Sequence, residues 1–152
     1  MSTNKIYIIA EIGINHNGSI DVAKQLIDIA HVAGCDAVKF QKRNPDVCVP
    51  EHQKSVMRET PWGKMTYLEY KYKVEFGDSE YNEIDQYCKQ KGILYLCTPW
   101  DLKTIDVLES FGVPAYKVAS ADLTNIPLLE KLSNTGKPLI LSTGMSKPEE
   151  VE

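Results

Sequence analysis

Apolar and polar positions alternate along the chain with recognisable periods. In residues 19–34 the apolar side chains recur at helical spacing, and Gly34 ends the pattern. The apolar face of this predicted helix consists of Ile20, Ala23, Ile27, Ala30 and Ala33. A shorter segment, residues 35–42, follows at once and predicts a strand.

This unit of a helix, a glycine and a strand recurs three more times. Helical patterns occupy residues 79–92, 101–112 and 125–136, and each ends at a glycine. The strands predicted after them are residues 93–99, 113–120 and 137–144. An opening strand, with Ile6, Ile8, Ile9 and Ala10 predicted to be buried, ends at Glu11. Five strands that alternate with four helices are typical of an α/β fold with a parallel sheet.

Two architectures fit this alternation: an open doubly wound sheet, and a (β/α)8 TIM barrel of which the first five units are present. Ser146 and Glu149 have the spacing of a capping box, and Pro148 suits a first turn, so a fifth helix is expected to begin here. We therefore expect residues 1–152 to be the N-terminal part of one barrel domain. A complete five-stranded flavodoxin-like domain with a frayed end is the alternative.

The connection formed by residues 43–77 is much longer than the others, and such connections are usually functional or disordered. It contains five aromatic residues: Trp62, Tyr67, Tyr70, Tyr72 and Phe76. A lid, a subunit contact and simple packing on the barrel rim all remain open. Aromatic residues and lysines interleave in residues 67–73, as in some nucleic-acid-binding segments, but acidic neighbours favour a solvated amphipathic face.

Composition narrows the class of protein. The chain has 152 residues, of which 43% are hydrophobic, and a formal net charge of −4 with both signs scattered, which argues against nucleic-acid binding. Its four cysteines, none in a CxxC pair, indicate reduced thiols in a cytoplasm rather than a zinc site or disulfides. No apolar run approaches the roughly 20 residues of a membrane span.

Polar side chains gather at the ends of the predicted strands. They are Glu11, Lys39, Gln41, Thr98, Lys117, Ser120 and Ser142. The carboxyl ends of parallel strands hold the active site in barrels and in open α/β sheets alike. We therefore expect these seven residues to line one site.

The lysines inside two of these strands need an explanation, because a buried unpaired charge is very costly. A salt bridge from Lys39 or Lys117 to Glu11 is one interpretation. A polyanion site is favoured, since two cations and several hydroxyls suit a phosphate and a carboxylate. Either lysine could instead form a Schiff base with a carbonyl substrate.

The three histidines are His16, His31 and His52, and their scatter indicates no metal site. For His16, a loop hydrogen bond is a better prediction than a role as proton carrier or ligand.

Five motifs together resemble the sialic acid synthase family, which makes N-acetylneuraminate and related nonulosonic acids. They are "AEIGINHNG", "AVKFQK", "CTPWD", "AYKVAS" with the following "ADLTN", and "LILSTGM", in order across essentially the whole chain. The resemblance implies a (β/α)8 barrel and a C-terminal antifreeze-like domain that this chain lacks. It also implies condensation of phosphoenolpyruvate with an open-chain N-acetylated amino sugar, such as N-acetylmannosamine, with release of phosphate.

Roles of single residues follow from the same resemblance. Lys39, Thr98, Lys117, Ser120 and Ser142 match positions that hold phosphoenolpyruvate. Glu11 and Gln41 match positions that face the amino sugar, and Glu11, Lys39 and Lys117 are the predicted catalytic residues.

The resemblance also implies a divalent metal, manganese or magnesium, whose ligands lie beyond Glu152, and a homodimer at full length. This part alone is expected to be inactive. A Schiff-base class I aldolase and a non-catalytic fragment that binds a phosphorylated ligand remain as alternatives, and the identity of the amino sugar stays open.

Overall fold

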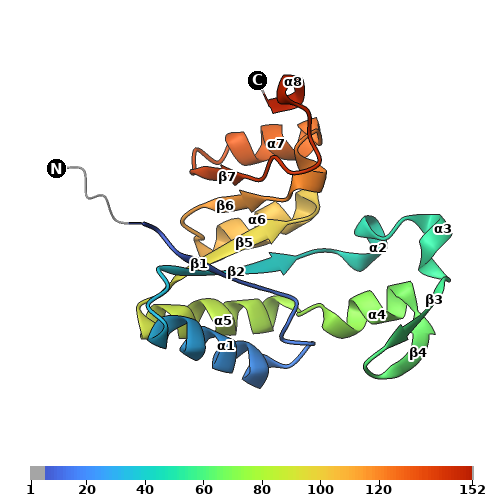
Figure 1. Cartoon of the computed structure of the whole chain (residues 1–152), viewed down its shortest axis with the longest axis horizontal. Coiled ribbons are helices and arrows are strands. Elements are labelled where there is room, and N and C mark those ends of the chain that lie inside the picture. The colour runs from blue at the N-terminus through green and yellow to red at the C-terminus, as the bar shows by residue number, and fades with distance from the viewer. Residues whose placement is uncertain (1–5, 152) are drawn as a thin grey trace.

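The computed structural model describes residues 6–151 and contains a five-stranded parallel sheet. Its strands are β1 (Ile9–Gly13), β2 (Ala37–Lys42), β5 (Leu94–Pro99), β6 (Tyr116–Val118) and β7 (Leu139–Leu141). They lie side by side in the order in which they occur along the chain, as Figure 1 shows. A doubly wound sheet reverses its strand order at a switch point, so the doubly wound alternative is wrong.

Four helices connect these strands: α1 (Ile20–Val32), α5 (Asp78–Lys91), α6 (Leu102–Phe111) and α7 (Ile126–Ser133). Consecutive helices along the chain contact one another, which places them in one layer. The predicted alternation of five strands and four helices is confirmed. A short helix α8 (Pro148–Val151) also forms, but the hydrogen bond at its start runs from the Lys147 N–H to Oε2 of Glu150 at 2.8 Å, one residue later than the predicted pair of Ser146 and Glu149.

The helix boundaries follow from local chemistry. Ser19 caps α1 by accepting a hydrogen bond from the Val22 N–H, and Asp101 caps α6 through the Thr104 N–H. Gly92 and Gly112 end their helices in the left-handed conformation that glycine adopts without steric cost.

One face of the sheet packs on the helices and forms the core. Alternate residues of the central strands, such as Phe40, Cys97 and Tyr116, are fully buried against helical side chains such as Ile27 and Leu108. Because neighbouring residues of a strand point to opposite faces, the residues between them face away from the helices. We call this second side the helix-free face.

The opening strand differs from its prediction. It begins at Ile9 and continues through a bulge to Gly13, past Glu11 where it was expected to end. Ile6 and Ile8 were predicted to be buried but are 81% and 51% exposed. Within the described residues β1 has a partner strand on one side only, which agrees with this exposure.

The long connection is fully structured. It consists of α2 (Pro45–Cys48), α3 (Glu51–Lys54), the antiparallel hairpin of β3 (Met57–Thr60) and β4 (Gly63–Thr66), and α4 (Tyr67–Val74). We call residues 43–77 the arm, because they extend beyond the end of β2 to one side of the sheet (Figure 1). Thr66 and Glu69 form a capping box at the start of α4.

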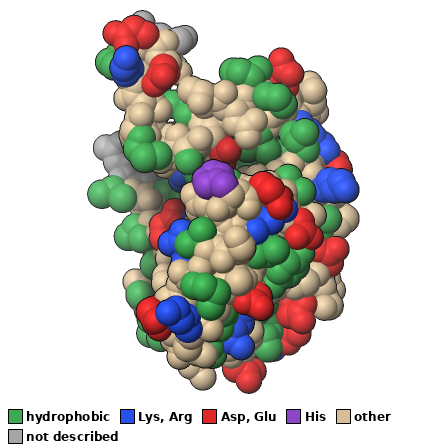
Figure 2. Space-filling view, turned by 90° about the vertical axis from the view of Figure 1, so that its right-hand side faces the viewer, with side chains coloured by type: hydrophobic (Ala, Val, Ile, Leu, Met, Phe, Trp, Pro, Cys, Tyr) green, Lys and Arg blue, Asp and Glu red, His purple; other side chains and the backbone are tan. Residues whose placement is uncertain are grey.

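The basic side chains of the arm lie over its own aromatic rings. Arg58 is 4.0 Å from the centre of the Tyr67 ring, and Lys73 is 5.1 Å from that of Trp62. Acidic and basic groups also intermix on this side of the molecule (Figure 2). Both observations agree with the predicted amphipathic face. No helix within residues 6–151 is both long and apolar enough to cross a bilayer.

Candidate active site

Lys39 is a buried cation on the helix-free face. Its side chain is 6% exposed, and its Nζ lies 2.6 Å from Oε2 of Glu11, whose side chain is 58% exposed. The two residues are direct partners in the β1–β2 ladder, so both point to the same face. The predicted salt bridge to Glu11 is therefore present at Lys39.

Lys117 is a second, partly buried cation on the same face. It follows Tyr116, which packs in the helical core, and therefore points away from the helices. Its Nζ donates hydrogen bonds to the Ser142 hydroxyl and, at 2.8 Å, to the Val118 carbonyl oxygen.

The pKa of Lys117 depends on the charges of Lys39 and Glu11. Burial lowers the pKa of Lys117, the positive charge of Lys39 lowers it further, and the negative charge of Glu11 opposes both effects. The structure thus brings Glu11, Lys39, Lys117 and Ser142 into one charged cluster, which we call the two-lysine cluster.

Gln41 and Thr98 extend this face toward the carboxyl ends of the strands. They are partners in the β2–β5 ladder, and Lys39 precedes Gln41 by two residues, so all three share a face. Thr98 is 2% exposed, and its Oγ1 is a buried oxygen with no hydrogen-bond partner in the structure. A buried hydroxyl without a partner is costly, unless a ligand or water satisfies it.

Ser120 lies just beyond the end of β6, in a 3-10 turn over Ser120–Asp122. It approaches the turn after β7, because a Cβ placed on Gly144 would be 3.7 Å from the Ser120 Oγ. The predicted site residues thus come from four neighbouring strands, β1, β2, β5 and β6, and from the segments that directly follow β6 and β7. Their two ammonium groups and three hydroxyls can bind an anion, with Glu11 offsetting one positive charge.

Three further residues beside the site were not predicted from the sequence. Arg43 follows Gln41 by two residues, and one of its terminal nitrogens donates a hydrogen bond to the Gln41 Oε1. Glu75, at the end of the arm, lies with its Oε2 3.5 Å from the Arg43 Nε, and the Tyr81 hydroxyl is 2.8 Å from the Glu75 Oε1. The repeat of polar residues at 39, 41 and 43 was a signal in the sequence.

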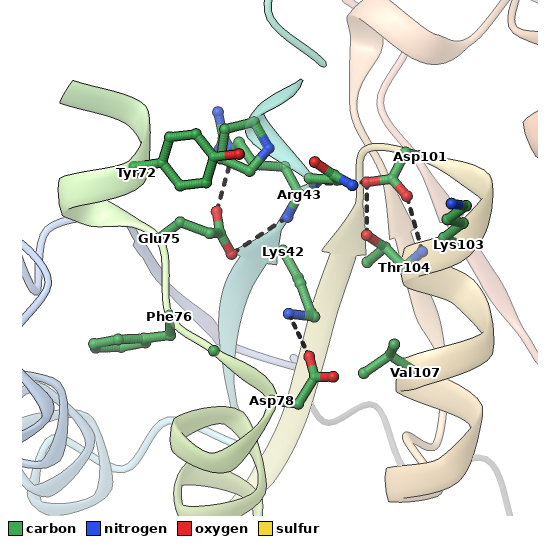
Figure 3. Close-up of a pocket in the computed structure, with 13 residues that line it drawn as sticks. Lys42, Arg43, Tyr72, Glu75, Phe76, Asp78, Asp101, Lys103, Thr104 and Val107 are labelled. Carbon is green, nitrogen blue, oxygen red and sulfur yellow. Dashed lines mark hydrogen bonds and ion pairs between the residues drawn. The ribbon is translucent and has the colours of Figure 1, made fainter. Parts of the chain in front are cut away.

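Glu75 is buried almost completely, with its side chain 7% exposed. Burial raises the pKa of Glu75 to about 7, although hydrogen bonds from Tyr81 and the Arg43 N–H and the charges of Arg43 and Lys42 lower it. Figure 3 shows Glu75 and Arg43 at the wall of a groove between the end of the arm and the start of α6.

That groove is separate from the two-lysine cluster and does not include Lys39 or Lys117. Lys42, the last residue of β2, lines the groove, and its Nζ forms an ion pair with Oδ1 of Asp78 at 2.9 Å (Figure 3). Arg43 in the groove faces Glu75, and Lys103 also lines it, so the groove has cations of its own but not the strand pair of Lys39 and Lys117.

His16 has a structural role in the loop after β1. It is 1% exposed, stacks on Phe76 at 4.0 Å, and accepts a hydrogen bond from the Gly18 N–H at its Nδ1. Burial lowers the pKa of His16 to about 4, so the ring is neutral at pH 7. The predicted loop hydrogen bond is confirmed.

The other sulfur and imidazole groups do not assemble a metal centre. All four cysteines are free thiols, as predicted. Across residues 6–151, no three side chains of His, Cys, Asp or Glu come close enough together to hold a metal ion.

Comparison with known proteins places these residues in a family. The NeuB family model matches residues 26–152. The chain is 37% identical over 150 residues to N,N'-diacetyllegionaminic acid synthase of Campylobacter jejuni, covering 97% of this chain and 45% of that protein. It is 38% identical over 143 residues to N-acetylneuraminate-9-phosphate synthase of Homo sapiens, covering 91% of this chain and 39% of that protein.

A solved structure agrees in fold and in sequence. The N-acetylneuraminic acid (sialic acid) synthetase of Leptospira borgpetersenii, in complex with citrate, superposes with a TM-score of 0.85 at 32% identity. The match covers 97% of this chain and 48% of that one. The chain therefore spans less than half the length of these three proteins.

Proposed function

Because this chain belongs to the NeuB family, we propose that it forms part of an enzyme that condenses phosphoenolpyruvate with an N-acetylated amino sugar and releases phosphate. The observation that supports this function is the two-lysine cluster on the helix-free face. Phosphoenolpyruvate carries a phosphate and a carboxylate, and two ammonium groups beside hydroxyls can bind both. Such an enzyme is a transferase that forms a C–C bond.

In the proposed reaction, C3 of phosphoenolpyruvate attacks the aldehyde carbon of the open-chain sugar, and the aldehyde oxygen takes up a proton. Positive charge develops at C2, where water adds and loses a proton. The bond between C2 and the phosphate oxygen then breaks while the C2 hydroxyl passes its proton to the leaving phosphate, which gives a keto acid and inorganic phosphate. Lys39 and Lys117 would hold the two anionic groups, so that C3 stays beside the aldehyde.

The hydroxyl residues, Glu11 and Gln41 also have roles in this proposal. Thr98, whose buried Oγ1 lacks a hydrogen-bond partner in the described residues, would donate a hydrogen bond to an oxygen of phosphoenolpyruvate, as would the hydroxyls of Ser120 and Ser142. Phosphoenolpyruvate on Lys39 would compete with Glu11 for the ammonium group. The exposed Glu11 carboxylate would then accept a hydrogen bond from a hydroxyl of the amino sugar or move a proton, and Gln41 would face the same sugar.

The proposal extends to a longer protein. Five parallel strands in chain order match the start of a (β/α)8 barrel, and the remaining strands and an antifreeze-like domain would belong to the rest of the polypeptide. A homodimer and a cytoplasmic location are part of the same proposal. The described residues do not supply a site for manganese or magnesium, so no step above is assigned to a metal.

A phosphate-release assay tests this function. The protein at its full natural length is incubated with phosphoenolpyruvate, manganese and either N-acetylmannosamine or a diacetamido sugar. Release of phosphate that requires both substrates is the expected result. The names of the relatives differ in the sugar acid made, so the acceptor is proposed only as a class. No release with any N-acetylated amino sugar would contradict the proposal.

A Schiff-base aldolase is a second candidate, because the pKa of Lys117 is lowered and a neutral amine is the nucleophile such an enzyme needs. Borohydride reduction in the presence of pyruvate distinguishes the two. A covalent adduct on Lys117 or Lys39 would favour the aldolase, whereas the condensing enzyme should remain unmodified.

A further inference from the structure

We infer that the buried ion pair of Arg43 and Glu75 positions Gln41 so that its amide nitrogen, rather than its oxygen, faces the amino sugar. This inference rests on the proposed function, because it assigns a direction to a hydrogen bond with that sugar. It makes Arg43 and Glu75 positioning residues, and it defines what Gln41 can recognise.

The direction follows from the chemistry of the guanidinium group. Arg43 only donates hydrogen bonds, so the Gln41 atom that faces it must be the amide oxygen. The Gln41 Nε2 then lies on the other side of the amide. It points toward the end of β1, because a Cβ placed on Gly13 would be 3.5 Å from it. The free donor is thus directed to the strand that carries Glu11.

Arg43 is itself held in place from several sides. Its side chain is 8% exposed, and it lies across the Trp100 ring, with 4.9 Å between the guanidinium carbon and the ring centre. Glu75 faces its Nε at 3.5 Å and accepts a hydrogen bond from the Arg43 backbone N–H at 3.3 Å. Removing either charge would leave the other buried and unpaired, which is strongly destabilising.

Tyr81 links this pair to the backbone of β2. Its hydroxyl lies 2.8 Å from the Glu75 Oε1 and 2.5 Å from the Gln41 carbonyl oxygen. Glu75 of the arm therefore contacts Arg43, and Tyr81 of α5 contacts the backbone of Gln41. With these contacts intact, the Gln41 amide cannot turn over without placing its NH₂ group against the guanidinium group.

The substrate group that Gln41 recognises is consequently a hydrogen-bond acceptor. A hydroxyl or carbonyl oxygen of the amino sugar fits, whereas a group that can only donate does not. A Gln41→Glu variant tests this directly. Glutamate has nearly the same shape and keeps an oxygen for Arg43, but it presents a second acceptor in place of the donor.

The kinetic test uses the full-length enzyme and four variants. Glu75→Gln removes the charge that fixes Arg43, and Arg43→Lys keeps the charge but loses the planar fork. These two variants and Gln41→Glu should each raise the KM for the amino sugar up to about tenfold, the effect of one neutral hydrogen bond, and leave the KM for phosphoenolpyruvate within about twofold. Asp78→Asn is the matched control, because it breaks the neighbouring pair with Lys42 and should change neither constant.

A second readout does not depend on turnover. With ¹⁵N-glutamine labelling, the side-chain amide signal of Gln41 should shift in the Glu75→Gln and Arg43→Lys variants and stay in place in Asp78→Asn. Thermal unfolding of each variant shows whether it is folded at the assay temperature.

The outcomes separate the two claims. Lack of turnover by the wild-type enzyme would count against the proposed function, and the Gln41 signal would still decide the orientation. Equal rises in both KM values, an unchanged Gln41 signal in the Glu75→Gln variant, or normal sugar binding by Gln41→Glu would each overturn the inference.

Discussion

At the scale of single residues, the buried lysines have different surroundings. Lys39 is compensated by Glu11, whereas Lys117 has hydrogen bonds to oxygen atoms of Ser142 and Val118 but no carboxylate contact at salt-bridge distance in the described part of the chain. The positive charge of Lys117 is therefore less neutralised than that of Lys39 and is more available to a bound anion. Binding of phosphoenolpyruvate should depend on it strongly.

We predict that Lys117→Ala weakens binding of phosphoenolpyruvate by about tenfold to a hundredfold, since a hydrogen bond to a charged group contributes about 1.5–3 kcal/mol. Isothermal titration calorimetry on the full-length protein measures this affinity. Lys64→Ala, at an exposed position of the hairpin, is the control and should bind normally. Unchanged affinity in Lys117→Ala would remove Lys117 from the anion site.

Because the pKa of His16 is lowered in the folded protein, we predict that the free energy of unfolding depends on pH. Its pKa is about 4 in the folded protein and 6.5 in an unfolded chain, so the unfolded state binds the proton first as the pH falls. Stability from this residue is present above pH 6.5 and is lost as the pH falls toward 4. The loss is at most about 3.5 kcal/mol, because one pKa unit corresponds to about 1.4 kcal/mol.

Urea unfolding between pH 7 and 4 measures this loss. Glu75 acts in the opposite sense between pH 4.5 and 7, because its folded pKa is raised, so the informative quantity is the difference between wild type and His16→Gln. His31→Gln, at an exposed position, is the control and should follow the wild type. Parallel curves for wild type and His16→Gln would contradict the prediction.

At the scale of elements, the arm is fixed to the body of the protein through a glycine. Gly18, in the loop between β1 and α1, has a φ of +72°, and a Cβ there would lie 2.2 Å from the Lys73 carbonyl oxygen in α4. Gly34, after α1, has a φ of +81° but would meet no atom within 4 Å. The two glycines thus share a backbone conformation and differ in their surroundings.

We predict that Gly34→Ala lowers the free energy of unfolding by about 1–2 kcal/mol, the cost of a left-handed conformation. Gly18→Ala should cost about 1–3 kcal/mol more, because α4 must also move away from the loop. Chemical denaturation of the two variants measures the difference. Equal costs would show that α4 does not pack firmly against this loop.

The regular elements were predictable from sequence and the arm was not, for a physical reason. Caps such as Asp101 and stops such as Gly112 act within a few residues, so the sequence alone reveals them. In the arm, Glu75 accepts a hydrogen bond from the Arg43 N–H, 32 residues away, and no local pattern encodes such a contact. The site shows the same division: alternation along β2 predicted that Lys39 and Gln41 share a face, but the Arg43–Glu75 pair needed the structure.

At the scale of the whole molecule, the sheet has two outer strands, β1 and β7. Leu141 in β7 is 47% exposed, close to the 51% of Ile8 before β1. In a closed barrel both strands gain a neighbour on their outer side, which removes the open edges.

Hydrogen exchange tests the closure of the barrel. In the full-length protein, backbone amides of residues 9–13 and 139–142 should exchange as slowly as those of residues 37–42 in the interior of the sheet. The 152-residue chain is the comparison, and its two outer strands should exchange faster. Rapid exchange at both edges of the full-length protein would contradict a closed barrel.

The alternation of buried and site-facing residues along β2 also makes the protein more tolerant of substitutions than of deletions in this strand. Phe40 packs with the helices, and its neighbours Lys39 and Gln41 point to the opposite side. A point substitution alters one of these environments, but a one-residue deletion in β2 would shift the following residues to the wrong side, placing polar groups in the core and apolar groups in the site. Length variation among relatives should therefore concentrate in the arm and be absent from β2.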